Sequence, residues 1–573
     1  MDRNSFIGLL LIFVIVTVWF SEPYQRIMYG DEAYEEMLRQ DSTAQKTVPD
    51  SLASTAQTAT KTQASSVPAF VGEEITSPDT AEKTFLLSTP LYKIELSNIA
   101  GGTVKNFRLY NFKRSIDPNA KPVNLINQKL SYFDNLNFIL KTKSGQEVDL
   151  KSYAFTPELS YDEKTIGGED SIKIVYTALI PELETKVSKV LTFYANKYDF
   201  RISLKASDSI FNSYDIVWKS GIANTEPNFD ENMAFNFVYH SNIEETDYET
   251  VGDDEILNEN YAGEMTWGAI RSKFFALVLS PIGSNFDNLL TTGYTKDVGE
   301  QVHQKIYALK GSGEFSGKAD FLIYFGPIKL EILESYEMGL ENLMDLGWWI
   351  VKPVTLFLLW FFTFLHGFIP NYGIMILVFA FLIKLVLYPL THKSFESMEK
   401  MSKLQPEIQK LKEKYPDDQS KQSQETFKLY QKHGANPLGS CLPTVLQFPI
   451  LIALYNVFRS TIDLRGEPFF GWITDLSQPD TIYQLPFIIP FYGDGVNILP
   501  ILMAATMFLQ SSMTVVDPKQ KAMIYVMPVF MLVIFNNFPS GLTWYYFLFN
   551  ILSIAQQYWI KKKRADAEIT VVK

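Results

Sequence analysis

Two hydrophobic patterns divide the chain. Between residues 84 and 327, short segments such as 92–96 and 172–176 alternate apolar and polar residues. This period of two is typical of strands that bury one face, and glycine-containing turns separate the segments. We therefore expect residues 84–335 to form an all-β domain, a β-sandwich.

Continuous apolar runs dominate the remainder of the chain. Each is close to the ~20 residues that a helix needs to cross a bilayer. Seven runs qualify as candidates: 6–20, 354–369, 374–390, 438–458, 496–513, 523–538 and 542–560. The pattern predicts a polytopic α-helical membrane protein that carries the β-sandwich between its first two apolar runs.

Lysines and arginines decide which runs cross. Segment 391–437 contains nine lysines and the tail begins with three lysines and an arginine, whereas 463–495 has Arg465 alone. Basic segments remain in the cytoplasm. All of them lie on that side only if one of the runs 354–369 and 374–390 does not cross. We assign the first to an interfacial amphipathic helix, because Trp348, Trp349 and polar residues suit the membrane surface.

The result is six spans, with both termini cytoplasmic and the sandwich on the outer side. Residues 1–20 form an uncleaved signal anchor, since Val18, Trp19 and Phe20 make a poor cleavage site. A cleaved signal peptide is the alternative. Residues 21–83, rich in Ser, Thr, Ala and Gln, form a disordered tether. The further units are an interfacial helix 342–369, spans 372–391, 438–462, 496–514, 522–538 and 542–560, a cytoplasmic hairpin 392–437, a periplasmic loop 463–495 and a tail 561–573.

The hairpin prediction rests on helical spacing. Leu404, Ile408, Leu411 and Tyr415 recur at intervals of three and four residues, and Pro416 begins the turn. Charged residues cover the other faces, among them Lys403, Lys410, Lys412 and Lys414. The hairpin is either a solvated protrusion or a docking arm for a partner.

Charge and composition exclude several classes of protein. The net charge is −13; residues 351–573 hold 20 Lys+Arg and 15 Asp+Glu, which leaves −18 for residues 1–350. Nucleic-acid binding needs clustered positive charge, so we expect no recognition of nucleic-acid sequence. Cys441 is the only cysteine and the five histidines are scattered, so we expect no disulfide, metal or other cofactor.

Lys384 is the one charged residue well inside a predicted span. A lysine at the bilayer centre costs about 2.5–3.5 kcal/mol, so it marks a functional site unless it snorkels to the headgroups. Gln447, Gln510 and Asn550 are either contacts between helices or, with Lys384, the lining of a wet cavity. No Asp or Glu lies in any predicted span, which argues against an ion-coupled transporter.

Several separate motifs carry a family resemblance. They include ANPLGSCLPTVLQFPILIALYNVFRS at 435–460, PFFGWITDLSQPD at 468–480 and FPSGLTWYYFLFNILSIAQQYWI at 538–560. With the order of the parts, they closely resemble the YidC/Oxa/Alb family of membrane protein insertases, in the form with a large periplasmic domain. The family core matches residues 342–562.

The resemblance implies an insertase and chaperone of the bacterial inner membrane that uses no ATP and is not an enzyme. It implies a five-helix core with a hydrophilic groove open to the cytoplasm and to lipid. Lys384 would stand there where many members have arginine, beside Gln447, Gln510 and Asn550. Clients would leave past a hydrophobic slide that includes Leu446, Ile450 and Phe530.

The implied partners are nascent inner-membrane proteins, Sec translocon subunits, and a ribosome or targeting factor at the hairpin. The short tail lacks the long basic extension that some members use on ribosomes. Two alternatives are a membrane-tethered periplasmic protein that binds or processes sugars, and a transporter. Five spans beyond an anchor exceed the need of the first, and the missing carboxylates weaken the second.

Overall fold

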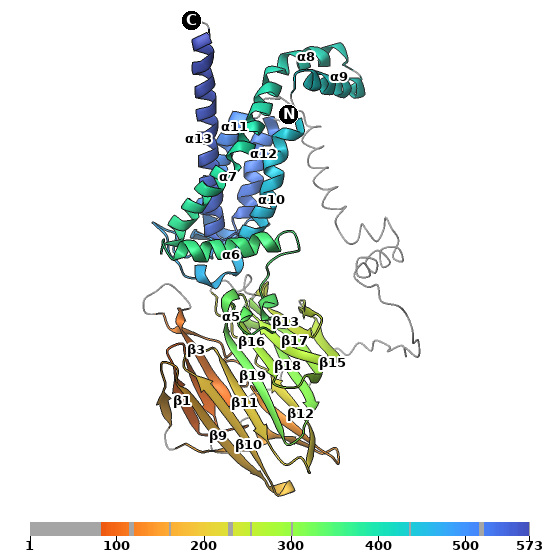
Figure 1. Ribbon diagram of the computed structural model, residues 1–573, viewed down its shortest axis with the longest axis vertical. Coiled ribbons are helices and arrows are strands. Elements are labelled where there is room, and N and C mark those ends of the chain that lie inside the picture. Colours follow the sequence, from red (N-terminus) through yellow and green to blue (C-terminus); the bar gives the residue numbers. More distant parts are fainter. Residues whose placement is uncertain are drawn as a thin grey trace, which may run out of the picture.

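The computed structural model describes residues 82–113, 120–159, 162–226, 233–252, 255–299, 302–416, 418–434, 437–514 and 521–571. The predicted signal anchor 1–20 and all but the last two residues of the predicted tether 21–83 lie outside this range. The described chain forms a β domain at one end and a helical bundle at the other (Figure 1).

The β domain contains two sheets. The smaller has the order β4-β3-β2-β1-β8, with β1 and β8 parallel and the other pairs antiparallel. Its strands are β1 (Thr84–Ser88), β2 (Tyr92–Ser97), β3 (Thr103–Lys113), β4 (Pro122–Asn124) and β8 (Glu163–Thr165).

The larger sheet has 14 strands: twelve follow the path β6-β5-β12-β18-β17-β15-β16-β19-β11-β10-β9-β7, β13 pairs with β15, and β14 pairs with β13. Its strands are β5 (Asn137–Thr142), β6 (Glu147–Asp149), β7 (Thr156–Pro157), β9 (Ser171–Ile180), β10 (Thr185–Tyr194), β11 (Asp199–Lys205), β12 (Phe211–Trp218), β13 (Phe237–Asn242), β14 (Thr246–Glu249), β15 (Ile256–Arg271), β16 (Phe275–Pro281), β17 (Phe286–Gly299), β18 (Val302–Glu314) and β19 (Lys318–Pro327).

The two sheets share one hydrophobic core. Phe107 of β3 lies 4.9 Å from Phe325 of β19 between ring centroids, and Trp218 and Trp267 are fully buried. Strand alternation supplies these inward residues, as the period of two predicts. The prediction of a β-rich domain before the helices is confirmed.

A short connection closes the β domain and leads into the bundle. Helix α5 (Leu330–Glu334) and the 3-10 turn η3 (Leu340–Leu343) bury Leu333, Leu340 and Leu343 in the sandwich core. Helix α6 (Lys352–His366) follows and lies across the end of the bundle that faces the sandwich (Figure 1).

The bundle consists of five long helices around their own core. They are α7 (Tyr372–Lys403), α10 (Pro437–Ser460), α11 (Ile498–Thr514), α12 (Lys521–Phe535) and α13 (Ser540–Val571). Among the described helices, α7 meets both the length and the hydropathy that a membrane span requires; α6, α11 and α12 are apolar but shorter. Large apolar side chains such as Leu385, Val386 and Val529 are exposed on the outer surface, as expected for contact with lipid.

Three details differ from the sequence-based boundaries. Helix α7 passes Pro389 without ending and continues to Lys403 through a polar segment that contains several Lys, Glu and Met residues, which favour helix. The hairpin beyond it consists of α8 (Gln405–Lys414) and α9 (Gln419–Lys432), while α13 extends to Val571. The predicted loop 463–495 contains the turn η4 (Ile462–Leu464) and strand β20 (Thr481–Ile489), which pairs with β21 (Gly493–Asn497).

Candidate functional site

Lys384 lies between α7 and α13, and its side chain is almost completely enclosed. It is 7% exposed, and its Nζ donates a hydrogen bond of 2.7 Å to Ser553 Oγ. The same Nζ lies 4.5 Å from the centroid of the Phe549 ring. A hydroxyl and an aromatic face both favour a cation, so α13 stabilises the charge that α7 carries into the bundle.

Helical spacing explains why these groups meet. Phe549, Ser553 and Gln556 follow one another at intervals of four and three residues, which places them on one face of α13. Thr391 lies two turns beyond Lys384 on α7, and its Oγ1 accepts a 3.0 Å hydrogen bond from Gln556 Nε2. The α7–α13 contact is thus a ladder of polar pairs, which we call the polar seam: Lys384–Ser553 and Thr391–Gln556.

Asn550 is on α13 too, but its amide turns to a different neighbour. It is 7% exposed, and its Nδ2 lies 3.4 Å from Thr506 Oγ1 and 3.5 Å from Met503 O, both on α11. Two turns further along, Gln557 is buried, and among the described residues both of its side-chain amide atoms lack a hydrogen-bond partner. A buried, unpaired amide is costly, so this part of α13 has hydrogen-bonding groups that contacts among the described residues leave unused.

The other predicted groove and slide residues are more dispersed. Gln447 and Ile450 on α10 and Gln510 on α11 are half-buried, while Phe530 on α12 is 36% exposed. The side chain of Leu446 lies outside the described residues. Within the described part of the chain, Lys384 makes no hydrogen bond to Gln447, Gln510 or Asn550. A shared groove lined by these residues therefore stays a prediction.

Sequence reasoning missed the hydroxyl partners Ser553, Thr391 and Thr506. A hydroxyl in an apolar helix commonly bonds to its own backbone, as Ser553 Oγ does to Phe549 O at 2.7 Å. A Ser or Thr within a span is therefore a weak signal. The seven-residue interval from Lys384 to Thr391 could have indicated a shared polar face.

The hairpin α8–α9 has a small apolar core and a basic surface. Leu404 and Ile408 are buried against Leu429 and Tyr430, so two of the four predicted apolar positions form this core. Lys403, Lys410 and Lys414 are exposed and Lys412 is half-buried. The core explains how so short a hairpin keeps its shape while its lysines face solvent.

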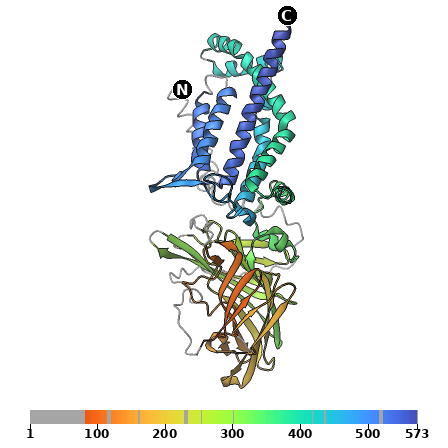
Figure 2. The same ribbon diagram turned by 90° about the vertical axis from the view of Figure 1, so that its left-hand side faces the viewer.

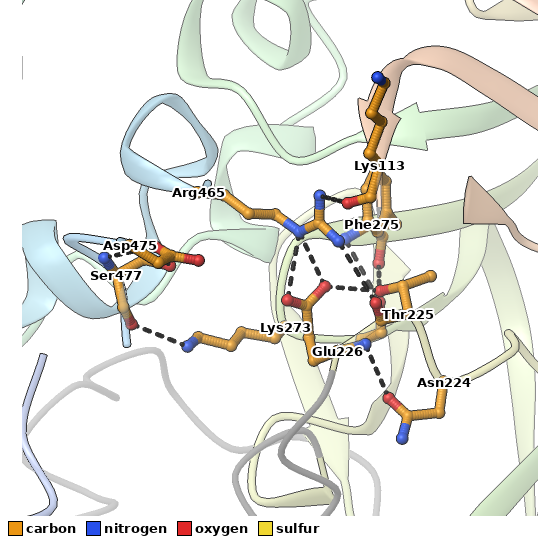
Figure 3. Close-up of polar contacts among 10 residues, drawn as sticks. Lys113, Asn224, Thr225, Glu226, Lys273, Phe275, Arg465, Asp475 and Ser477 are labelled. Atoms are coloured by element: carbon orange, nitrogen blue, oxygen red, sulfur yellow. Dashed lines mark hydrogen bonds and ion pairs between the residues drawn. The ribbon is translucent and has the colours of Figure 1, made fainter. Parts of the chain in front are cut away.

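A second polar cluster joins the sandwich to the loop after α10 (Figure 3). Arg465 Nε lies 2.9 and 3.2 Å from the two carboxylate oxygens of Glu226, and both side chains are nearly buried, at 5% and 3% exposure. Arg465 also donates to the backbone carbonyls of Lys113 at 2.8 Å and Thr225 at 3.3 Å. We call this set of contacts the Arg465 junction.

Two weaker contacts lie beside the Arg465 junction. Lys329 Nζ pairs with Asp463 at 3.0 Å, and Lys273 Nζ lies 3.5 Å from Ser477 O. Asp475 beside Ser477 is half-buried, and the loss of solvent around it raises the pKa of its carboxyl. The sandwich therefore contacts the bundle through several charged groups, and Arg465–Glu226 is a more enclosed ion pair than Lys329–Asp463.

Comparisons with known proteins agree with this architecture. Residues 364–567 match the family described as 60Kd inner membrane protein, and residues 85–359 match the YidC periplasmic domain. These two parts define the class: inner-membrane proteins with a periplasmic domain.

Individual relatives specify the family. Proteins named membrane protein insertase YidC from Prosthecochloris aestuarii and Chlorobaculum tepidum are each 34% identical, over 99% of this chain and 96% of theirs. A crystal structure of an active YidC insertase with its first transmembrane domain resolved aligns over 84% of this chain and 93% of its own, at 20% identity and a TM-score of 0.37. The chain belongs to the YidC family of membrane protein insertases, which confirms the resemblance. A tethered sugar-processing protein is not favoured, because the match covers the helices as well as the sandwich.

Proposed function

We propose that this chain inserts nascent inner-membrane proteins along the polar seam between α7 and α13, where Lys384 attracts acidic residues of the client. One observation carries the proposal. Lys384 is a buried cation for which, among the described residues, Ser553 alone accepts a hydrogen bond.

An ammonium group has three donors, so two remain for water or for a client carboxylate. A buried charge with unused donors is costly in hydrocarbon, and proteins keep such groups where they act. The neighbouring Thr391–Gln556 pair extends the polar path along the seam. A client segment that follows this path crosses less hydrocarbon than the full ~30 Å of the bilayer core.

The proposed topology has six spans. They are α7, α10, α11, α12, α13 and the N-terminal run 6–20, with α6 along the outer surface. In support, the lysine-rich α8–α9 hairpin and the C-terminal end of α13 lie at the end of the bundle away from the β domain (Figure 1). Basic segments belong on the cytoplasmic side, so the sandwich is periplasmic and both termini are cytoplasmic.

Release into lipid completes the proposed cycle. The apolar client span moves sideways past Ile450 and Phe530, and its transfer to lipid supplies about 25 cal/mol per Å² of apolar area. No bond is made or broken, so we assign no catalytic residue and no cofactor. The exposed lysines of α8 would contact a ribosome or targeting factor, and Sec translocon subunits would act as lateral partners.

Paired clients test the role of Lys384. One client has an acidic translocated segment and the other the same segment neutralised, and insertion is measured by protease protection. We expect Lys384→Arg to be tolerated, whereas Lys384→Ala and Lys384→Glu slow the acidic client several-fold, with Glu the slower. Ser553→Ala is the matched control, because it removes the hydroxyl but leaves the charge.

The two clients separate the explanations. Equal slowing of insertion for both clients would reject electrostatic attraction by Lys384. Hydration of the groove would then be its remaining role. Normal insertion of both clients by Lys384→Ala would show that the lysine merely snorkels towards the headgroups.

A further inference from the structure

The β20–β21 hairpin exposes an unusual amount of apolar surface. Phe491 is 91% exposed and Ile488 is 75% exposed. Four more large apolar side chains on the hairpin are exposed: Ile482, Tyr483, Phe487 and Ile489. Clusters of this kind on a protein surface mark a site that something else covers.

The hairpin has little internal support. Tyr483 pairs with Val496, Gln484 with Gly495 and Ile489 with Gly493, so residues 485–488 of β20 have no partner on β21. No third strand extends this sheet in the described part of the chain. An isolated two-stranded hairpin is marginally stable in water, so its conformation requires contacts beyond its own ladder.

Strand β21 and the turn that precedes it are attached to the bundle. Asn536, at the end of α12, is fully buried, and its Nδ2 donates hydrogen bonds of 2.8 Å to the carbonyls of both Tyr492 and Gly495. Asn497 donates in turn to the carbonyl of Asn536, and α11 begins at the next residue, Ile498. This side of the hairpin is therefore fixed at the ends of two helices of the bundle.

The direction of the hairpin is visible in Figure 2. It extends sideways from the end of the bundle that faces the sandwich, at the height of α6. Helix α6 also carries exposed aromatic side chains there, Phe357, Trp360 and Phe364. Two apolar elements thus project from the bundle at one level, which is the level expected for the outer surface of the membrane.

The charge of the β20–β21 hairpin indicates what kind of surface covers its apolar side chains. Residues 481–497 contain one charged side chain, Asp494, and no lysine or arginine. A surface for an acidic or basic protein partner would need complementary charge, whereas the interfacial zone of a bilayer accepts Phe, Tyr and Ile. We infer that β20–β21 lies on the outer leaflet and inserts its apolar side chains at the boundary of headgroups and acyl chains. This inference rests on the proposed crossing of α11 and α12.

A fluorescent depth measurement tests this inference on the full-length protein. Cys441 is replaced by serine, a single cysteine is introduced by Phe491→Cys or Ile488→Cys, and an environment-sensitive NBD label is attached. The protein is placed in nanodiscs whose lipids carry a spin label near the carbonyl or near the chain end. Leu179→Cys on the exposed surface of the sandwich is the water-facing control.

We expect both hairpin probes to be quenched at least twofold more strongly by the shallow spin label than the Leu179→Cys probe, and to be protected from iodide. Emission as in water with free access of iodide would overturn the inference. Protection from iodide without quenching by lipid would also overturn it, because a protein surface would then cover the hairpin.

A further probe separates this result from the proposed topology. Val529→Cys lies on the exposed side of α12 and should be quenched by the deep spin label. If the Val529→Cys probe is quenched and the hairpin probes are not, the hairpin inference alone fails. If none is quenched, the crossing of α12 is wrong and the hairpin inference falls with it.

Discussion

Arg465→Ala should release the sandwich from the helical bundle. Arg465 and Glu226 are separated by 239 positions in the chain and lie on different parts of the protein. Removing Arg465 deletes the ion pair and the donors to Lys113 O and Thr225 O. The Glu226 carboxylate then remains buried, with the hydroxyl of Thr225 at 2.7 Å as a donor.

The burial of Arg465 and Glu226 determines how much docking free energy the Arg465→Ala change removes. Breaking a buried pair by removing one partner costs about 3–5 kcal/mol, because the other charge is left uncompensated. The cost falls on the docking of the two parts, since each has its own core. A change of this size corresponds to a roughly hundredfold to several-thousandfold shift of the docking equilibrium.

Distances between spin labels measure docking directly. Labels replace the exposed Ile243 on the sandwich and Phe368 after α6, in a chain with Cys441 replaced. We expect a narrow distance distribution in the parent and a broad one in Arg465→Ala. The control is Lys318→Ala, which removes the exposed Lys318–Asp320 pair within the sandwich and should change nothing.

Two results test whether the Arg465 junction holds the sandwich on the bundle. Combining Glu226→Gln with Arg465→Met should narrow the distribution relative to Arg465→Ala, because no buried charge is then left alone. An unchanged narrow distribution in Arg465→Ala would refute the assignment of docking energy to this pair.

Three further predictions concern topology, the α8–α9 hairpin and the sandwich. A cysteine replacing Lys412 should react with an impermeant reagent only from the cytoplasm and one replacing the exposed Asp494 only from the periplasm; labelling of the first from outside would end the six-span proposal. Reversing the charges of the exposed Lys410 and Lys414 should slow insertion severalfold while circular dichroism stays unchanged; normal rates would show that these lysines are dispensable. Burial lowers the pKa of Lys189 from 10.5 to about 7, so between these values the unfolded chain binds one more proton and the free energy of unfolding rises with pH by up to about 1.4 kcal/mol per unit. Lys189→Met should flatten this rise in hydrogen exchange of β10, corrected for the intrinsic pH dependence; an equal slope in parent and variant would contradict it.

The sequence predicts the elements whose pattern is local. Alternation over 92–96 and 172–176 corresponds to β2 and β9, and the long apolar runs correspond to the helices of the bundle. Lys384 stands out because a charge in an apolar run is rare and costly. Its burial between α7 and α13 is consistent with that expectation.

Features that depend on contacts between residues far apart in the sequence cannot be predicted from local patterns. The β20–β21 hairpin lacks regular alternation and contains Pro486 and Pro490, so most of it falls within the predicted loop 463–495. In the sequence, Arg465 is notable only as the single basic residue of the predicted loop 463–495, because its partner Glu226 lies in another part of the chain. Periodicity reports which face is buried but not what covers that face, and tertiary contacts decide the rest.

Insertion by the purified chain is the direct test of the proposal that this protein inserts clients without nucleotide and with the help of Lys384. The full-length protein is reconstituted into liposomes without nucleotide or any other protein, and a single-span client with an acidic translocated segment is added. We expect a protease-protected client fragment, whose amount falls severalfold when the vesicles contain the Lys384→Ala variant. Equal protection in protein-free liposomes, or protection that appears only when a nucleotide is added, would contradict it.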